Sequence, residues 1–339
     1  MAAVRTIAVT NQKGGVGKTT TVANLGAALA RRRVNVCLVD LDPQANLTMH
    51  FGIDPTALPA SAYDVMTAET PLTAAAVLVE PHLTVVPSVI DLAAAEVELA
   101  GAVGREQILR DRLAQTGLPY DLVLIDCPPS LGLLTLNALA AAGEVLIPLQ
   151  PHFLALQGLG KLLQTVHLVR RRVNPDLVVT GVVFCMYESG TRLAGEVVAD
   201  VTRFFEAARG ANEPWSAARV FRSRIRRNIK LAECPSYGTT IFSYEPSSHG
   251  AADYEALAEE FFEVFLAAPA QTERRADDAP APIEGAASVR APSDSAPPET
   301  VPAPDARVEA SLADEAAVAP APRDGVDAEP SQPAPPAAP

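Results

Sequence analysis

The chain has 339 residues, with 27 Lys and Arg against 40 Asp and Glu, for a formal net charge of −13. As an average, that balance argues against a nucleic-acid partner. The charge is uneven, however, because residues 271–339 hold five Arg, no Lys and thirteen Asp or Glu, together with 14 of the 30 prolines. Such acidic, Pro- and Ala-rich sequence buries too little apolar surface to offset chain ordering, so we expect 271–339 to be a disordered tail.

Residues 1–270 carry a net charge of −5 and are numerous enough for one large α/β domain. The four cysteines show no paired or metal-ligand spacing, which indicates inert buried thiols in a reducing compartment: Cys37, Cys127, Cys185 and Cys234. The chain shows neither a signal peptide nor an apolar run of about 18 to 20 residues, as a membrane span needs. We therefore expect a cytoplasmic protein without a membrane partner.

Short apolar runs alternate with helical patterns along the chain. The predicted strands are 6–10, 34–40, 83–87, 121–126, 144–148 and 177–184, and the predicted helices are 19–32, 91–115, 131–142, 154–173, 191–209 and 250–267. Most of the runs are continuously apolar, which is typical of strands covered by helices on both faces. This order predicts a doubly wound, mostly parallel sheet, whose ligands bind at the carboxyl ends of the strands.

The sequence KGGVGKTT follows the first strand directly and precedes a helix, which is the context of a phosphate-binding P-loop. Its glycines permit tight turns that expose backbone amides to phosphate oxygens. Lys18 would reach the outer phosphates, and the Thr19 hydroxyl would bind Mg²⁺. The candidate nucleotide-binding residues are Lys13, Gly14, Gly15, Val16, Gly17, Lys18, Thr19 and Thr20.

Two features of this loop are unusual. Gln12 stands where the common P-loop pattern has its first glycine, and a second lysine, Lys13, lies just inside the loop. The chain has only four lysines among its 27 basic residues, and two of them fall within this loop. We therefore interpret both lysines as functional rather than incidental.

Three carboxylates end predicted strands. Asp126 follows LeuValLeuIle, where it could hold Mg²⁺ through a water, and Asp40 and Asp42 end the second strand. Positions i and i+2 of a strand share a face, so both Asp40 and Asp42 could face the nucleotide. Either could orient a water for attack on the γ-phosphate, although a structural role is more credible for Asp40 than for Asp42.

These segments resemble those of the deviant Walker A ATPases, and among them the ParA/Soj partition ATPases. The matching stretches are NQKGGVGKTT at 11–20, LVDLDPQANLT at 38–48, DLVLIDCPPSLGLLTLNAL at 121–139 and RNIKLAECPSYG at 227–238. The resemblance implies an ATP-dependent homodimer in which Lys13 reaches the partner's phosphates. It also implies that Lys18 contributes to catalysis, that Asp42 orients the attacking water and that Asp126 is the Mg²⁺-linked acid.

The resemblance further implies non-specific binding of double-stranded DNA, association with the nucleoid, and a ParB-like partner that stimulates ATP hydrolysis. Six basic residues with no acid among them form the candidate DNA-binding stripe: Arg219, Arg222, Arg224, Arg226, Arg227 and Lys230. Because phosphate contacts depend on local charge, this stripe matters more than the net charge. Arg226 replaces a proline that relatives commonly have. A second basic run, Arg170 to Arg172, ends a predicted helix, where cations complement the helix dipole, so we do not assign it to DNA binding.

Two other classes of protein share such a loop. A MinD-like membrane ATPase would use a basic amphipathic C-terminal helix, but the helix predicted at 250–267 has an acidic polar face. A cobyrinic or biotin-pathway ligase would not need the basic stripe, and an iron–sulfur reductase would need paired cysteine ligands. The role of the acidic tail stays open between a solvating spacer and a competitor of DNA for the stripe.

Overall fold

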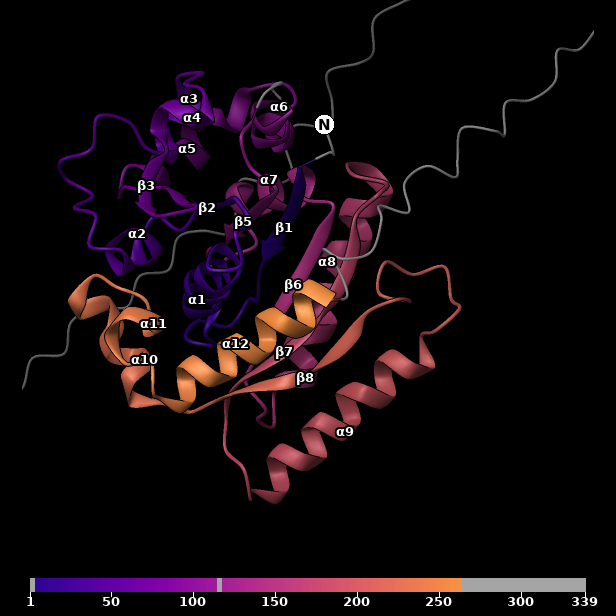
Figure 1. Cartoon of the computed structure of the whole chain (residues 1–339). Helices are drawn as coiled ribbons and strands as arrows, with labels where there is room; N and C mark the ends of the chain where they lie inside the picture. Colours follow the sequence, from indigo (N-terminus) through magenta and orange to yellow (C-terminus); the bar gives the residue numbers. More distant parts are fainter. Residues whose placement is uncertain (1–3, 115–117, 264–339) are drawn as a thin grey trace, which may run out of the picture. The chain divides into compact units, whose positions relative to one another are not determined.

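The computed structural model describes residues 4–114 and 118–263, all within the first of the two compact units into which the chain divides, 1–275 and 276–339 (Figure 1). The tail predicted at 271–339 and the last positions of the helix predicted at 250–267 lie outside the described residues.

Within the described part of the chain, eight strands form one sheet in the order β3-β4-β2-β5-β1-β6-β7-β8. Neighbouring strands are parallel except for β3 and β4, which pair antiparallel. The strands are β1 (Arg5–Val9), β2 (Val36–Asp40), β3 (Val77–Glu80), β4 (Leu83–Val86), β5 (Leu122–Asp126), β6 (Glu144–Leu149), β7 (Val178–Tyr187) and β8 (Arg219–Arg226). All six strands predicted from the sequence are present, and the mostly parallel, doubly wound sheet is confirmed.

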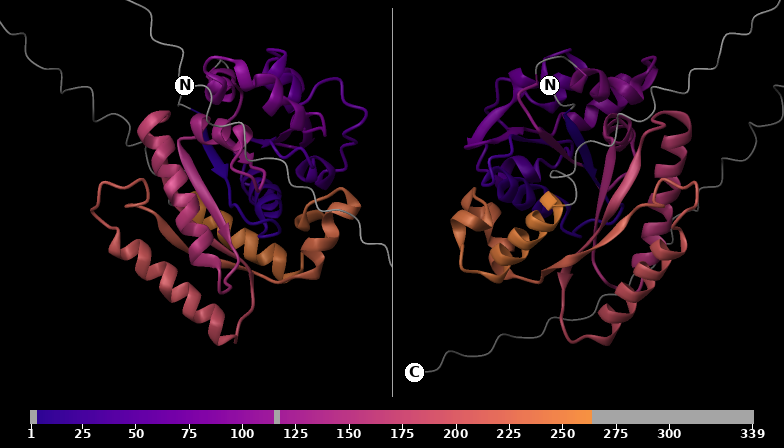
Figure 2. Two further views of the ribbon diagram at one scale, coloured as in Figure 1. Left: turned by 180° about the vertical axis from the view of Figure 1, so that it is seen from behind. Right: turned by 45° about the vertical axis from the view of Figure 1, so that its right-hand side comes forward.

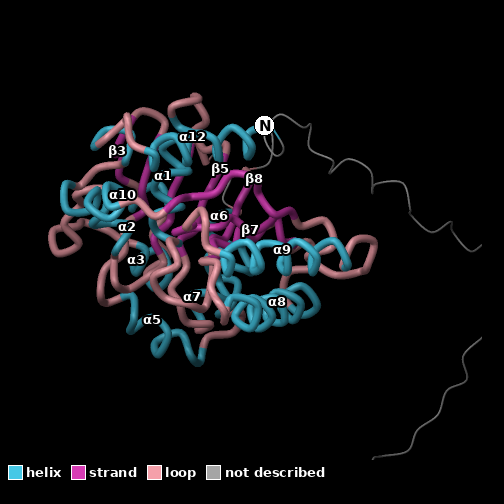
Figure 3. Tube along the Cα trace, turned by 90° about the horizontal axis from the view of Figure 1, so that it is seen from below, coloured by secondary structure: helices cyan, strands magenta, loops and turns pink. Residues whose placement is uncertain are grey.

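Helices cover both faces of the sheet (Figure 3). One face packs against α1 (Lys18–Ala30), α2 (Asn46–His50), α10 (Ile229–Glu233), α11 (Ile241–Tyr244) and α12 (His249–Phe261). The other packs against α3 (Ala62–Thr67), α4 (Leu72–Ala75), α5 (Leu92–Glu98), α6 (Ile108–Leu113), α7 (Leu133–Ala141), α8 (Ala155–Arg172) and α9 (Arg192–Ala207). The central strands are buried on both sides, which explains their continuously apolar sequences.

The prediction of a single helix over 91–115 is wrong. The chain there forms α5, the short 3₁₀ turns η1 (Leu99–Gly101) and η2 (Arg105–Gln107), and then α6. The helical run stops after Gly101, because Ala102 is extended, and Gly104, with a positive φ of 74°, directly precedes η2. A third 3₁₀ turn, η3 (Cys234–Tyr237), follows α10.

Strand β8 was not predicted, because its arginines hide a short alternation. Phe221 and Ile225 are buried against the helical layer, whereas Arg222 and Arg224 are exposed. Helix α12 runs alongside this strand, as the two views of Figure 2 show. The basic stripe therefore lies on the edge strand of the sheet and on the start of α10 that follows it.

The four cysteines are free and buried, as the sequence predicts. Over residues 4–114 and 118–263, the structure contains no helix with the length and apolar character of a bilayer span.

Candidate functional site

The loop between β1 and α1 lies at the carboxyl edge of the sheet, at its centre. Its start is anchored by Asn11, whose side-chain amide donates to the carbonyl of Pro148 at the end of β6 across 2.8 Å. Gly15 and Gly17 have positive φ values of 68° and 92°, as predicted for a loop whose amides turn inward. A side chain at Gly17 would be strained and would meet the Cβ of Cys185 at 3.4 Å, so the turn requires glycine.

Lys18 and Thr19 begin α1 and point toward the end of β5. The Lys18 side chain is 7% exposed, and its Nζ donates to the carbonyl of Lys13 across 3.2 Å. Burial lowers the pKa of Lys18, and the nearby carboxylate of Asp126 opposes that shift. The Thr19 hydroxyl donates to Oδ2 of Asp126 across 2.7 Å, so the loop and the strand-end acid meet before any ligand is added.

Asp126 ends β5 directly opposite Asp40, which ends the neighbouring strand β2. Burial raises the pKa of Asp126 well above its usual value, and the adjacent Asp40 raises it further. The second oxygen of Asp126, Oδ1, is buried without a hydrogen-bond partner among the described residues. A cation beside this oxygen would offset both costs, and Mg²⁺ commonly takes one or two protein oxygens with water and phosphate completing its shell, so the residues fit that ion.

The two acids of β2 have different surroundings. Asp40 is fully buried; Oδ2 accepts from the Thr48 amide at 2.9 Å and from its hydroxyl at 2.7 Å. Oδ1 accepts from the Asp42 amide at 3.1 Å. Burial raises the pKa of Asp40 to about 7. These contacts support the structural role that the sequence made more credible for Asp40 than for Asp42.

Asp42 is 8% exposed, and its Oδ1 accepts from the amide of Gln44 across 3.0 Å. Ala45, which follows, has a φ of 52°, a left-handed conformation that costs a non-glycine residue about 1 kcal/mol. The turn that carries Asp42 is therefore held in one strained shape rather than being loose. Such strain is common in loops at functional sites.

Lys13 contacts a residue that the sequence reasoning did not single out. Its Nζ lies against Nε2 of His152, in the loop between β6 and α8. A signal was present, because His152 follows a predicted strand closely and so belongs to the same carboxyl edge as the P-loop. Residues 13–20, Asp40, Asp42 and Asp126 all gather at this edge.

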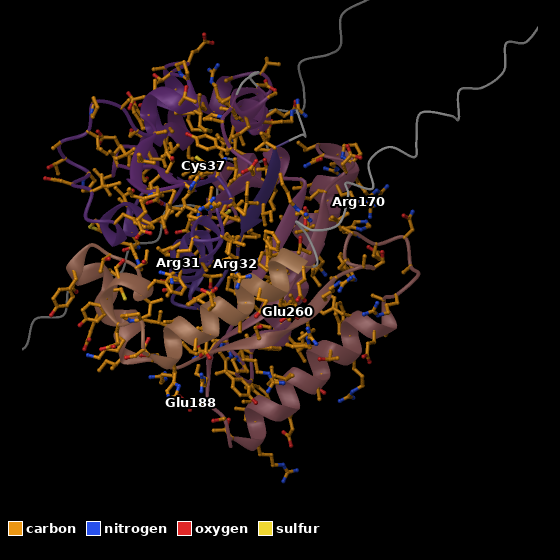
Figure 4. All side chains as sticks on the ribbon, in the orientation of Figure 1. Arg31, Arg32, Cys37, Arg170, Glu188 and Glu260 are labelled. Carbon is orange, nitrogen blue, oxygen red and sulfur yellow. The ribbon has the colours of Figure 1, made fainter. Side chains whose placement is uncertain are left out.

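The basic stripe is separate from this cluster, since β6 and β7 lie between β1 and β8. Its positive charge is also partly neutralised by acids that lie outside the stripe in the sequence. Four of its six members face carboxylates: Arg222 pairs with Glu260 at 3.7 Å, Arg226 with Asp253 at 2.6 Å, Arg227 with Glu188 at 2.9 Å and Lys230 with Glu233 at 2.9 Å. Figure 4 shows Glu260 on α12 and Glu188 beyond the end of β7.

The remaining two members carry no ion pair with the described residues. Arg219 is exposed, and Arg224 lies over the ring of Tyr187, 4.6 Å from its centroid, with an N–H donated to the Tyr187 hydroxyl. Arg222 and Arg227 keep exposed side chains despite their ion pairs. Because exposed ion pairs contribute little stability, phosphate oxygens could compete for these guanidinium groups.

Arg226, where the resemblance leads one to expect proline, is held by contacts with Asp253. Its backbone N–H donates to Oδ2 of Asp253 across 2.9 Å, and its guanidinium binds both oxygens of the same carboxylate. A proline would supply neither donor. Asn228 caps the N-terminus of α10, because its side-chain oxygen accepts from the amide of Lys230.

The sheet order, the glycine loop and the strand-end acid define a P-loop nucleotide-binding protein, and an AAA domain family matches residues 4–179. Sporulation initiation inhibitor protein Soj of Bacillus subtilis is 43% identical over 256 residues, which cover 75% of this chain and 96% of that protein. The chromosome-partitioning ATPase Soj of Thermus thermophilus is 46% identical over 263 residues, covering 76% and 96%. The chain belongs to this Soj/ParA family of partition ATPases, as the sequence resemblance predicts.

A solved structure carries a different name. The crystal structure of cobyrinic acid a,c-diamide synthase from Mycobacterium smegmatis, with bound ATP analog and magnesium, is 39% identical, covers 76% of this chain and 93% of that chain, and has a TM-score of 0.65. The shared architecture thus also occurs under the name of an amide-forming enzyme, which was one of the alternatives from the sequence.

Proposed function

We propose that this protein is a Mg²⁺-dependent ATPase that dimerises with ATP, binds double-stranded DNA without sequence preference and serves chromosome or plasmid partitioning. The observation that carries the proposal is the meeting of Thr19 with Asp126 beside the glycine loop, at the centre of the carboxyl edge. Family membership supports the same activity.

In this proposal, the residues of the loop have distinct tasks. The amides of Gly14 to Thr20 and the start of α1 bind phosphate oxygens, and Lys18 neutralises charge on the transferred group. Thr19 and Asp126 hold Mg²⁺, which would screen the charge that develops on the phosphates. Asp40 acts on this site indirectly, by fixing α2 and the Asp42 turn through its contacts with Thr48 and the Asp42 amide.

Asp42 would orient the attacking water, and Lys13 would complete the site in a second copy of the chain. Lys13 is exposed at the surface of the loop, so its side chain could reach a partner's phosphates once its ammonium leaves His152. A cation inserted in this way stabilises the transition state of phosphoryl transfer, as an arginine finger does. Hydrolysis would then depend on dimerisation.

Dimerisation is tested by sedimentation velocity with ATP, ADP or no nucleotide. The wild type should sediment as a dimer with ATP alone, and Lys13→Gln should weaken that association while still binding ATP. Lys161→Gln removes an exposed lysine from α8 and is the matched control. Equal association of the Lys13 and Lys161 variants would contradict the role of Lys13.

The DNA surface in this proposal is the face of β8 and α10, with Arg219, Arg222, Arg224 and Arg227 as its most exposed cations. Arg226 and Lys230 lie on the same surface, although each is paired with an acid. A ParB-like partner would stimulate hydrolysis, and DNA binding would keep the protein on the nucleoid.

Amide ligation is a second candidate, favoured by the name of the 39%-identical structure. The two functions differ in what ATP turnover requires. A ligase hydrolyses ATP in step with an organic acid and an amine donor, whereas the proposed ATPase turns over without either and responds to DNA. Turnover stimulated by DNA in a buffer without organic substrate supports partitioning, and turnover that demands a carboxylic acid supports ligation.

A further inference from the structure

The loops after β1 and β6 are locked together at their start. The two strands are parallel neighbours, with Val9 opposite Leu146. Beyond the strand, the Thr10 amide donates to the carbonyl of Leu146 across 3.2 Å, and Asn11 donates to the carbonyl of Pro148. The end of β6 is therefore held against the start of the P-loop by one backbone and one side-chain hydrogen bond.

Beyond these bonds, Nζ of Lys13 lies against Nε2 of His152. The backbone of Lys13 is held by two bonds, since its amide donates to Asn11 Oδ1 at 3.0 Å and its carbonyl accepts from Lys18 at 3.2 Å. Its long side chain is exposed and would otherwise sample many rotamers. The imidazole is the group that gives the ammonium a defined position.

The ring of His152 faces two donors at once. Nδ1 lies 3.1 Å from the amide of Leu154, which can donate to it, and Nε2 faces the Lys13 ammonium. A neutral imidazole has one acceptor nitrogen, so it accepts fully from one donor or the other, depending on its tautomer. A change of tautomer that moves the proton from Nδ1 to Nε2 would form the bond from Leu154 and release Lys13, so the contact can be broken without a change in the net charge of the ring.

We propose that His152 is a positioning residue for Lys13, which it holds against its own β6–α8 loop until the lysine leaves to reach a phosphate. The inference deepens the proposed dimerisation and rests on it. His152 then competes with the partner's nucleotide for the ammonium, so it sets the protein concentration at which ATP can assemble the dimer. Partial burial lowers the pKa of His152, and the neighbouring charge of Lys13 lowers it further, which favours the neutral ring that can accept a hydrogen bond.

Two substitutions separate the hydrogen bond from the bulk of the side chain. His152→Leu removes the acceptor, and His152→Gln retains one. With ATP, the leucine variant should associate at about fivefold lower protein concentration than the wild type, the effect expected of one exposed charge-assisted contact. The glutamine variant should behave as the wild type, and in a Lys13→Gln background His152→Leu should change nothing.

A second measurement tests the contact without any dimer. An NMR titration of the histidine ring protons of the nucleotide-free protein reports the pKa of His152, and Lys13→Gln should raise it because the neighbouring positive charge is gone. His249, at the start of α12, is the internal control. Saturating ATP with Mg²⁺ should raise the same pKa in the wild type, because Lys13 leaves the ring.

The outcomes are distinct. A His152 titration that Lys13→Gln leaves unchanged would overturn the contact. A leucine variant that associates like the wild type, or whose effect persists without Lys13, would overturn the positioning role. A wild type that never dimerises with ATP would contradict the proposed function instead, and the response of the His152 titration to ATP would then decide whether Lys13 leaves the ring for the nucleotide of its own chain.

Discussion

The hydroxyl of Thr19 donates to Oδ2 of Asp126 across 2.7 Å, while Oδ1 of the same carboxylate is buried with no partner among the described residues. The first residues of α1 and the end of β5 thus bring a hydroxyl and this carboxylate oxygen together. The unsatisfied oxygen and the adjacent Asp40 make the nucleotide-free site costly, because buried like charges repel. A divalent cation would relieve that cost.

Replacement of Asp126 by asparagine should therefore have opposite effects with and without ligand. Without nucleotide, Asp126→Asn should raise the melting temperature, since the substitution removes a buried acid whose ionisation is opposed by burial and by Asp40. With Mg²⁺ and ATP, the variant should lose most of the thermal stabilisation that the wild type gains, because the metal-binding oxygen loses its charge. Thermal melts in both conditions measure the two effects. An undiminished shift with Mg²⁺ and ATP would exclude Asp126 from the metal site.

Asp42→Ala should slow hydrolysis by about 100-fold or more, while ATP binding and ATP-dependent association persist. The reason is that Asp42 touches the attacking water in the proposed mechanism, whereas its backbone carbonyl still accepts from Ala45 and keeps the turn closed. Steady-state phosphate release measures the effect, and Asp54→Ala, in an exposed turn further along the chain, is the control. Normal turnover by the Asp42 variant would remove it from the mechanism.

Arg226→Leu should destabilise the fold by about 2 kcal/mol, because Asp253 would remain buried without its bidentate partner. The double replacement with Asp253→Leu should recover part of that loss, since no unpaired charge is left behind. Urea denaturation of the two single variants and the double variant gives the interaction energy. If the loss in the double variant equals the sum of the two single losses, the ion pair does not stabilise the contact between β8 and α12.

Acid should destabilise the protein partly through His50. This side chain is buried with neither ring nitrogen hydrogen-bonded within the described structure, and burial lowers its pKa from 6.5 to about 4. The unfolded chain therefore takes up the proton first, and stability is lost as the pH falls from about 6.5 toward 4. At about 1.4 kcal/mol per pH unit, the loss at pH 5 is about 2 kcal/mol.

His50→Leu should remove this contribution. The unfolding free energy of the variant should therefore fall by about 2 kcal/mol less than that of the wild type when the pH is lowered from 7.5 to 5. Other titrating groups, including Asp40, cancel in that difference. Urea denaturation at the two pH values supplies it. The same pH dependence in both proteins would mean that His50 takes up its proton equally in the folded and unfolded chains.

The geometry of the candidate nucleotide site could be largely predicted from the sequence because its parts are local. A glycine loop between a strand and a helix has one arrangement, and an acid that ends a buried strand lies at the carboxyl edge. The hydrogen bond from Thr19 to Asp126 joins residues 107 positions apart, yet both positions follow from these local rules. The sequence favoured a structural role for Asp40 over Asp42, but it could not show the contacts with Thr48 on which that role depends.

The basic stripe shows where local reasoning ends. The stripe covers twelve consecutive positions that contain no acid. Two acids of α12 nevertheless contact it: Glu260 lies 38 positions after Arg222, and Asp253 lies 27 positions after Arg226. These two acids are seven residues apart, and hence on one face of a helix, which is a signal that the sequence does contain. The contact between Lys13 and His152 likewise needs the knowledge that β1 and β6 are neighbours.

The most direct test of the account is DNA binding as a function of nucleotide. In a mobility-shift assay with plasmid DNA, the wild type should bind with ATP and Mg²⁺ and fail to bind with ADP or without nucleotide. Arg222→Glu with Arg224→Glu should abolish the shift and leave ATP affinity intact, whereas Arg110→Glu, on α6 and far from β8, should not. Binding should weaken steeply with salt, by a log–log slope of about −0.9 per neutralised phosphate. Binding that is equal with ATP, with ADP and without nucleotide, or no binding at all, would contradict the account.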